Sequence, residues 1–278
     1  MLWQRLITGA ALAAALVAAL IWLPVSLLLL LLAGVVLAGA WEWAGLAGFS
    51  AMRRGAYGAT IAGLLIVSYL IVGYWGWPHF TAPLLGIAGL WWLGVLYWVG
   101  TYPRTADRWN RLRTPLMGGM ALVPAWVAAH WLLRQDQGAL WLGAVVFLVA
   151  CSDVGAFFGG RTWGRRHLAL RVSPGKTWEG AACGLALSVV MALLLIQPLG
   201  LGDRWLQWLA VVVVGISAGV LGDLAESMVK RHHGVKDSGT LLPGHGGVLD
   251  RIDSLSAALP AFALGLLMAG VHSAGLAP

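Results

Sequence analysis

Long apolar runs alternate with short segments rich in Pro, Gly, aromatic and charged residues along the whole chain. A helix needs about 20 residues to cross the roughly 30 Å hydrocarbon core of a bilayer. Runs of this length predict an all-α polytopic membrane protein with nine transmembrane helices. The predicted spans are Leu6–Leu23, Val25–Trp41, Ala56–Tyr74, Leu84–Tyr102, Pro115–Leu133, Ala139–Phe158, Trp178–Ile196, Trp205–Ala225 and Leu255–His272.

The first two spans are separated by Pro24, which predicts a tight hairpin rather than one long helix. The first span follows Arg5, as the apolar region of a secretory signal would. Its run is long and Ala-rich, has no small-x-small cleavage site at its end and leads directly into a second span. We therefore expect it to be an uncleaved helix.

Basic residues define the predicted orientation. Only Arg134 and Arg204 fall in loops on one side, and all other Lys and Arg residues fall in loops on the side of the N-terminus. Because cytoplasmic loops carry an excess of Lys and Arg, this asymmetry predicts a cytoplasmic N-terminus and a periplasmic C-terminus. The alternative is eight or ten spans with a chance asymmetry.

Composition agrees with this picture. Of 278 residues, 18 are Lys or Arg and 11 are Asp or Glu, and 60% are hydrophobic. A soluble domain would be charged at about a quarter of its positions, so soluble and disordered classes are excluded. The net charge of +7 comes from short loops between spans, so we expect no nucleic-acid partner. Cys151 and Cys183 lie in apolar segments and are interpreted as small core residues.

Acidic residues gather in the last predicted cytoplasmic region. Asp223, Glu226, Ser227 and Lys230 are spaced i, i+3, i+4 and i+7, which places them on one stripe of a helix. Asp223 follows the apolar run 211–221, where an unpaired carboxylate is costly and needs a metal ion or a basic partner. The alternative is structural: Asp223 and Glu226 only pair with Lys230 or the adjacent Arg231.

The loop that follows has the residues of a phosphate site. Gly244, Gly246 and Gly247 allow a sharp turn that presents backbone N–H groups to an anion. Asp250 and Asp253 are carboxylates of the kind that bind Mg²⁺ on phosphates. Positive charge for a polyanion comes from Lys230, Arg231, Lys236 and Arg251. His245 is a phosphate donor, a general acid or a turn residue, and His232 and His233 are expected to be solvated.

A second constellation covers Ser152–Arg161 and Arg171–Gly180. Gly175-Lys176-Thr177 resembles the end of a Walker A loop, but Leu170 stands where that pattern needs Gly and no strand is predicted before it. We expect a short basic loop that opens a helix, with Ser173 available as its cap. The alternative is a loop that only fixes topology.

These residues carry a resemblance to a known family. One string of residues resembles the signature of the phosphatidate cytidylyltransferases, or CDP-diacylglycerol synthases. It reads Ser227-x-Val229-Lys230-Arg231-x4-Lys236-Asp237-x-Gly239-x2-Leu242-Pro243-x-His245-Gly246-Gly247-Val248-x-Asp250-Arg251-Ile252-Asp253. Two further strings also resemble parts of that family: Ser152-Asp153-x-Gly155-Ala156 and Ser173-Pro174-x-Lys176-Thr177-x-Glu179-Gly180. The match covers the C-terminal half, and before Gly138 only hydropathy and length agree. We therefore expect one membrane domain, 1–278, with N-terminal helices over 1–137 and catalytic helices and loops over 138–278.

The resemblance implies a homodimeric, multi-pass enzyme of the bacterial inner membrane. Such an enzyme uses Mg²⁺ to join phosphatidate and CTP and releases pyrophosphate. It implies that Asp223 and Asp250 hold the metal. We expect Glu226, Asp237 and Asp253 to complete or orient the ligand shell of that metal. We assign catalytic roles to Asp223, Asp250, Lys230 and Lys236, and we expect substrate contacts from Ser173, Lys176, Thr177, Arg231, Asp237, His245, Gly246, Gly247 and Arg251. Asp153 is a weaker candidate for a metal or base contact.

Two rival functions predict other patterns. A transporter or flippase for an anionic solute predicts charges near mid-span and broken helices in paired halves, whereas the charges here lie at one end of the spans. A CDP-alcohol phosphotransferase needs an Asp-Gly-x2-Ala-Arg string, which the sequence lacks.

Overall fold

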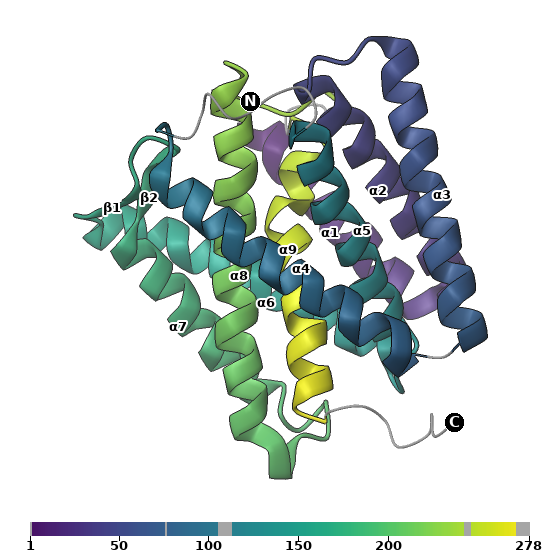
Figure 1. The fold of residues 1–278 in the computed structure, drawn as a ribbon. Coiled ribbons are helices and arrows are strands. Elements are labelled where there is room, and N and C mark those ends of the chain that lie inside the picture. The colour runs from purple at the N-terminus through teal and green to yellow at the C-terminus, as the bar shows by residue number, and fades with distance from the viewer. Residues whose placement is uncertain (1, 76, 105–112, 242–245, 271–278) are drawn as a thin grey trace.

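The computed structural model describes residues 2–75, 77–104, 113–241 and 246–270, and these residues form a helical bundle with one small hairpin (Figure 1). The elements are α1 (Leu2–Trp22), α2 (Val25–Leu46), α3 (Ala51–Trp75), α4 (Trp77–Thr101), α5 (Arg113–Leu133), α6 (Gly138–Trp163), β1 (His167–Ala169), β2 (Ser173–Thr177), α7 (Trp178–Leu194), the 3-10 helix η2 (Gly202–Arg204), α8 (Trp205–His232) and α9 (Leu249–Met268).

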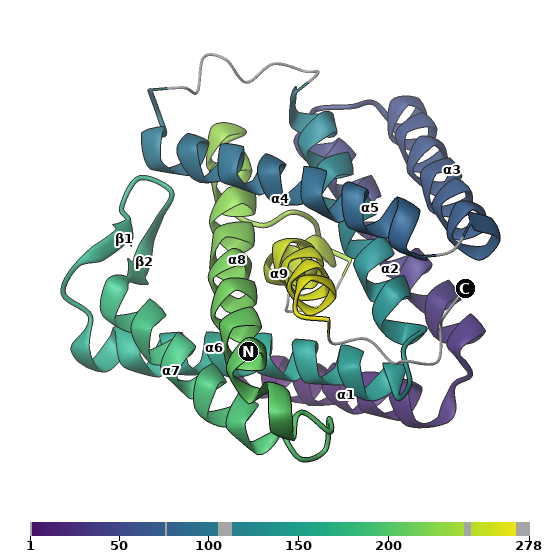
Figure 2. The ribbon, with the colours of Figure 1, turned by 60° about the horizontal axis from the view of Figure 1, so that its bottom comes forward.

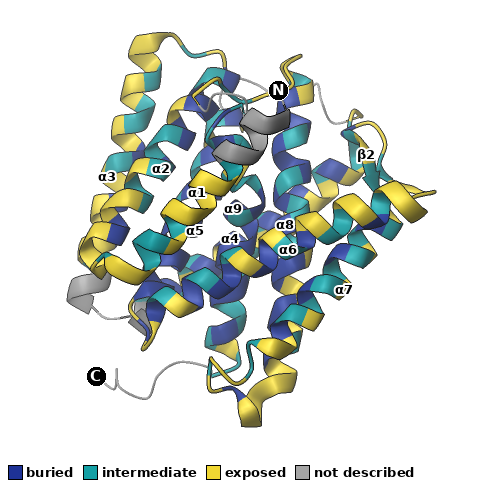
Figure 3. Ribbon diagram, turned by 180° about the vertical axis from the view of Figure 1, so that it is seen from behind, coloured by how far each residue is buried: buried dark blue, intermediate teal, exposed yellow. Residues whose placement is uncertain are grey.

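Helix α9 is the centre of the fold. It packs against α2, α4, α5, α6 and α8, and Figure 2 shows it nearly along its axis with its neighbours around it. Phe262 and Leu266 of α9 are buried, as is Trp208 of α8, whose ring contacts that of Phe262. Exposed residues follow the outer faces, most clearly on α3 (Figure 3), where they include Ile66 and Leu70. Large apolar side chains on an outer face suit a lipid environment.

Seven helices among the described residues are long and apolar enough to cross a membrane: α2, α3, α4, α5, α6, α8 and α9. The other two provide shorter apolar stretches, Gly9–Trp22 and Trp178–Leu194. The prediction of an all-α polytopic membrane protein is therefore confirmed. The prediction of nine membrane crossings is not confirmed. α7 has only 17 residues, which gives it a length of roughly 25 Å at the usual helical rise.

The helices follow the predicted spans but extend beyond them where polar residues find partners. α2 continues past the predicted end at Trp41 to Leu46, α8 continues to His232, and α9 begins at Leu249 rather than Leu255. The break between α1 and α2 at Pro24 is confirmed. The predicted end of the last span, His272, lies outside the described residues.

The segment before α7 is a hairpin and not the expected loop. β1 and β2 pair antiparallel, with His167 opposite Thr177 and Ala169 opposite Ser173. Gly175-Lys176-Thr177 forms the end of β2, so a strand contains this string. The helix begins one residue after Thr177, whose Oγ1 accepts the N–H of Gly180 at 3.1 Å. Thr177 is therefore the N-cap, and the expected cap at Ser173 is wrong.

Small residues bring α6 and α7 together. An added Cβ at Gly155 would meet backbone atoms of Cys183 and Gly184, and one at Gly180 would meet the carbonyl oxygen of Ala156. Because glycine has no side chain, these positions let two membrane helices approach backbone to backbone. Cys183 lies in this contact, and both it and Cys151 are free. The close contact fixes Asp153 of α6 beside the start of α7.

Candidate active site

A polar pocket of about 300 Å³ lies between α6, the hairpin, the start of α7, α8 and α9. Its lining combines carboxylates, a lysine and hydroxyl groups with apolar walls. The lining residues are Ser152, Asp153, Ala156, Phe157, Leu168, Gly175, Lys176, Thr177, Gly180, Ala181, Val220, Asp223 and Ser254. Segments that are far apart in the sequence, and that were predicted separately as candidate sites, therefore form one pocket.

Asp223 joins the hairpin to α8 in this pocket. Its Oδ2 forms an ion pair with Nζ of Lys176 on β2, and its Oδ1 accepts a hydrogen bond of 3.3 Å from the Ser227 hydroxyl. Both charged side chains remain partly exposed to the pocket. The basic partner that the sequence predicted for Asp223 is thus Lys176 and not Lys230 or Arg231.

Asp223 also interacts electrostatically with one carboxylate on each of two other helices. The negative charge of Asp223 on α8 repels both Asp153 on α6 and Asp253 on α9. Lys176 attracts both of these carboxylates, and Arg251 attracts Asp153. The pocket therefore concentrates negative charge and surrounds it with bases, as a site for a cation and a polyanion requires.

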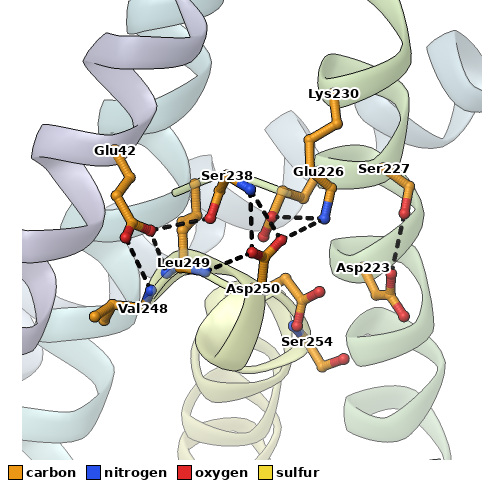
Figure 4. Close-up of polar contacts among 12 residues, drawn as sticks. Glu42, Asp223, Glu226, Ser227, Lys230, Ser238, Val248, Leu249, Asp250 and Ser254 are labelled. Carbon is orange, nitrogen blue, oxygen red and sulfur yellow. Dashed lines mark hydrogen bonds and ion pairs between the residues drawn. The ribbon is translucent and has the colours of Figure 1, made fainter. Parts of the chain in front are cut away.

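Lys230 connects a second pair of carboxylates. Its Nζ lies 3.0 Å from Oε1 of Glu226 and 2.7 Å from Oδ1 of Asp250, and its side chain is 11% exposed (Figure 4). The alternative in which Glu226 pairs with Lys230 is therefore what the structure shows. Oε2 of Glu226 is buried and has no hydrogen-bond partner among the described residues.

Asp250 organises the glycine turn that precedes α9. Its Oδ2 accepts hydrogen bonds from the backbone N–H of Ser238 at 3.0 Å and of Gly247 at 2.8 Å. Gly246 has a φ of 82°, and an added Cβ there would overlap Oδ2 of Asp250. In this structure the Gly247 N–H therefore holds a carboxylate of the chain rather than an external anion.

Glu42 of α2 is a site residue to which the sequence reasoning assigned no role. It is 3% exposed, and its carboxylate accepts hydrogen bonds from the Ser238 hydroxyl and from the backbone N–H groups of Val248 and Leu249 (Figure 4). Val248 is the N-cap of α9 and Leu249 is its first residue, and the free N–H groups at a helix start favour a negative charge. Glu42 thereby fixes the helix that carries Asp250. An acidic residue between Trp41 and Trp43 was the available signal.

The remaining predicted residues lie around this centre. Nε of Arg231 donates to the Val172 carbonyl at 3.4 Å, which ties α8 to the hairpin. Lys236 and Asp237 are exposed in the loop after α8. His245 lies outside the described residues.

The two neighbouring histidines lie at the end of α8. His232 is half-buried, and Nε2 of His233 lies 3.4 Å from the Thr114 hydroxyl in a partly buried contact. Partial burial and the adjacent His232 lower the pKa of His233. Neither histidine lines the polar pocket.

Comparisons with known proteins identify relatives that match nearly the whole chain. The chain is 42% identical to the phosphatidate cytidylyltransferase of Pseudomonas aeruginosa, over 97% of this chain and 98% of that protein. It is 38% identical to the Haemophilus influenzae protein of the same name, over 94% and 97% of the two chains. Phosphatidate cytidylyltransferase 5, chloroplastic, of Arabidopsis thaliana is 37% identical over 64% of this chain and 43% of its own length.

A sequence profile described as the Cytidylyltransferase family matches residues 3–269. This range contains the polar pocket, the hairpin and Glu42, and the two bacterial relatives extend over nearly all of it. The chain therefore belongs to the cytidylyltransferase family.

Proposed function

We propose that this chain transfers the cytidylyl group of CTP to phosphatidate, giving CDP-diacylglycerol and pyrophosphate in phospholipid biosynthesis. Full-length similarity to two bacterial phosphatidate cytidylyltransferases supports the reaction. The structural observation that carries the proposal is the polar pocket, where Lys176, Asp223 and Asp153 gather from a hairpin and two helices. Such a pocket combines positive charge for phosphate groups with carboxylates for a cation.

The reaction needs no nucleophile from the protein. A phosphate oxygen of phosphatidate attacks the α-phosphorus of CTP, a new P–O bond forms, and the bond to the β-phosphate breaks as pyrophosphate leaves. The chain has to hold two anionic substrates in line and balance their charge. Lys176 and Thr177 line the pocket itself, and we assign phosphate contacts to Lys230, Lys236, Arg231 and Arg251 around it.

We propose Mg²⁺ as the cofactor, held by Asp223 and Asp250 with Glu226 and Asp253 beside them. Carboxylate oxygens are the ligands that Mg²⁺ prefers, and the bound ion would neutralise charge on the reacting phosphates. Within the described ranges no three such side chains are already gathered around one point. Lys176 and Lys230 instead compensate Asp223 and Asp250, and one Glu226 oxygen is unpaired. These carboxylate oxygens are therefore suitable ligands for Mg²⁺. When Mg²⁺ and CTP bind, Lys176 and Lys230 would exchange their carboxylate partners for phosphate groups.

We place the pocket on the cytoplasmic side of a bacterial inner membrane, with nine crossings and a cytoplasmic N-terminus. Arg134 follows α5 and Arg204 precedes α8, and Figure 1 shows these two helix ends away from the β1–β2 hairpin that lines the pocket. This agrees with the positive-inside rule for the rest of the chain. CTP is water-soluble and would enter from this side. A homodimer stays a prediction from the family resemblance.

The fate of each CTP phosphate tests the proposed reaction. With purified protein, phosphatidate and Mg²⁺, label from the α-phosphate of CTP should appear in the lipid, and label from the γ-phosphate should appear only in pyrophosphate. Phosphatidylcholine, which has no free phosphate monoester, should yield no labelled lipid. Transfer of γ-label to the lipid would instead indicate a kinase, and no labelled lipid at all would refute the proposal.

A further inference from the structure

A second pocket, of about 500 Å³, lies on the other side of the hairpin, between the end of α4, the hairpin and α8. We name it the lateral pocket. It shares Leu168 with the polar pocket, and its residues Trp178 and Leu224 directly follow Thr177 and Asp223 of the polar pocket. The hairpin is therefore a common wall between two neighbouring pockets.

The lateral pocket is mostly apolar but has two positive charges. Leu96 and Val99 of α4 line one wall, and Leu170 and Val172 of the hairpin line the other. Leu170 and Trp178 are 58% and 60% exposed, so apolar surface continues outward from the pocket. Arg104 and Arg171 also line it, and no ion pair involves either arginine among the residues that the structure describes.

Apolar walls and two guanidinium groups suit a ligand with acyl chains and an anionic head. Guanidinium groups bind phosphate with charge-assisted hydrogen bonds, and acyl chains gain from contact with apolar walls. A nucleotide would leave these walls unused. The hairpin wall is held in place, because Arg231 of α8 donates to the Val172 carbonyl.

We propose that the lateral pocket is the phosphatidate site, with the acyl chains against α4 and the hairpin and the phosphate near Arg104 and Arg171. This inference rests on the proposed function. The common wall at Leu168 then places the lipid phosphate next to the pocket that holds CTP. The lipid enters from the bilayer between α4 and the hairpin, and the nucleotide enters from water.

Two glycines of α4 provide a matched test. An added Cβ at Gly100, which lines the lateral pocket, or at Gly94, which does not, meets nothing within 4 Å. Leu is also a better helix former than Gly, so both substitutions are compatible with folding. Gly100→Leu fills the pocket and should raise the KM for phosphatidate about tenfold while the KM for CTP stays unchanged. Gly94→Leu should match the wild type.

The positive charges need a separate variant. Arg104→Gln combined with Arg171→Gln should also raise the KM for phosphatidate about tenfold, through lost charge-assisted hydrogen bonds, without changing the KM for CTP. If the KM for CTP rises instead, the pocket binds nucleotide and the inference is wrong. If Gly100→Leu and Gly94→Leu give the same KM for phosphatidate, the lipid lies elsewhere.

A binding measurement separates this inference from the reaction. Phosphatidate with a photoreactive acyl chain should label peptides from Leu96–Thr101 or from the hairpin in the wild type and in Gly94→Leu, and label them weakly in Gly100→Leu. Unlabelled phosphatidate should compete, and inorganic phosphate should not. Labelling confined to other helices would overturn the site even in an active enzyme. Labelling here with no cytidylyl transfer would refute the proposed function and leave the lipid site standing.

Discussion

Asp223→Asn is expected to lower turnover about a thousandfold, because it removes a carboxylate that we propose holds a divalent cation against the reacting phosphates. The same change should leave the protein folded. Its ion pair with Lys176 is partly exposed and contributes little to stability. Loss of the negative charge also relieves repulsion on Asp153 and Asp253. We expect an inactive enzyme whose thermal midpoint in detergent is equal to that of the wild type or higher.

The control for this variant is Asp203→Asn. Asp203 is exposed in η2, at the opposite end of α8 from the pocket. Its substitution should change neither the turnover nor the thermal midpoint. Full activity in Asp223→Asn would overturn the assignment of this carboxylate. A large drop in thermal midpoint would show that Asp223 is a structural residue.

Glu42→Ala is expected to lower the free energy of unfolding by about 3 kcal/mol, since it leaves three donors around the start of α9 without their acceptor. Turnover should fall about a hundredfold, as is typical when a residue that orients a metal ligand is lost. We expect Glu42 to act by positioning Asp250 through the start of α9 and not by contacting substrate. Amide exchange at Leu249 should therefore accelerate while the KM for CTP changes less than kcat.

A graded variant checks this explanation. Ser238→Ala removes one of the three hydrogen bonds to Glu42 and should have a smaller effect in the same direction. Glu42→Gln keeps the shape but removes the charge that favours the helix start, and should lie between the two. If Glu42→Ala has wild-type activity and unchanged exchange at Leu249, the carboxylate does not organise this loop.

The helices could be predicted because a bilayer imposes a simple length rule on apolar runs. Their ends could not, since the polar residues there are paired within the fold. The predicted second span ended at Trp41 because Glu42 is acidic, and α2 continues because three donors from α9 and its loop meet that carboxylate. The nearest of these donors lies almost 200 residues away in sequence, beyond any local pattern.

The hairpin escaped prediction for a local reason. Pro174 and Gly175 within β2 are residues that strands disfavour, and three to five residues are too few for a clear alternation. Because the strand continues to Thr177, the N-cap of α7 is Thr177 and not the predicted Ser173.

The candidate acids and bases were found by their positions near helix ends. Of their ion pairs, the sequence suggested the one between Glu226 and Lys230, which are four residues apart on one helix, but not the pairs between distant segments. Lys176 with Asp223 and Lys230 with Asp250 are tertiary contacts. The division of the chain at residue 138 stays a prediction, and Glu42 shows that the N-terminal part contributes to the same site.

We propose above all that the carboxylates of α8 and α9 hold the divalent cation, and the position of the cation can be measured directly. Fe²⁺ bound in place of Mg²⁺, with ascorbate, generates radicals that cut the backbone close to the metal. We expect CTP-dependent cuts near Asp223 of α8 and near Asp250 of α9, suppressed by excess Mg²⁺ and absent in Asp223→Asn. Cuts confined to other helices, or unchanged cuts in that variant, would contradict the account.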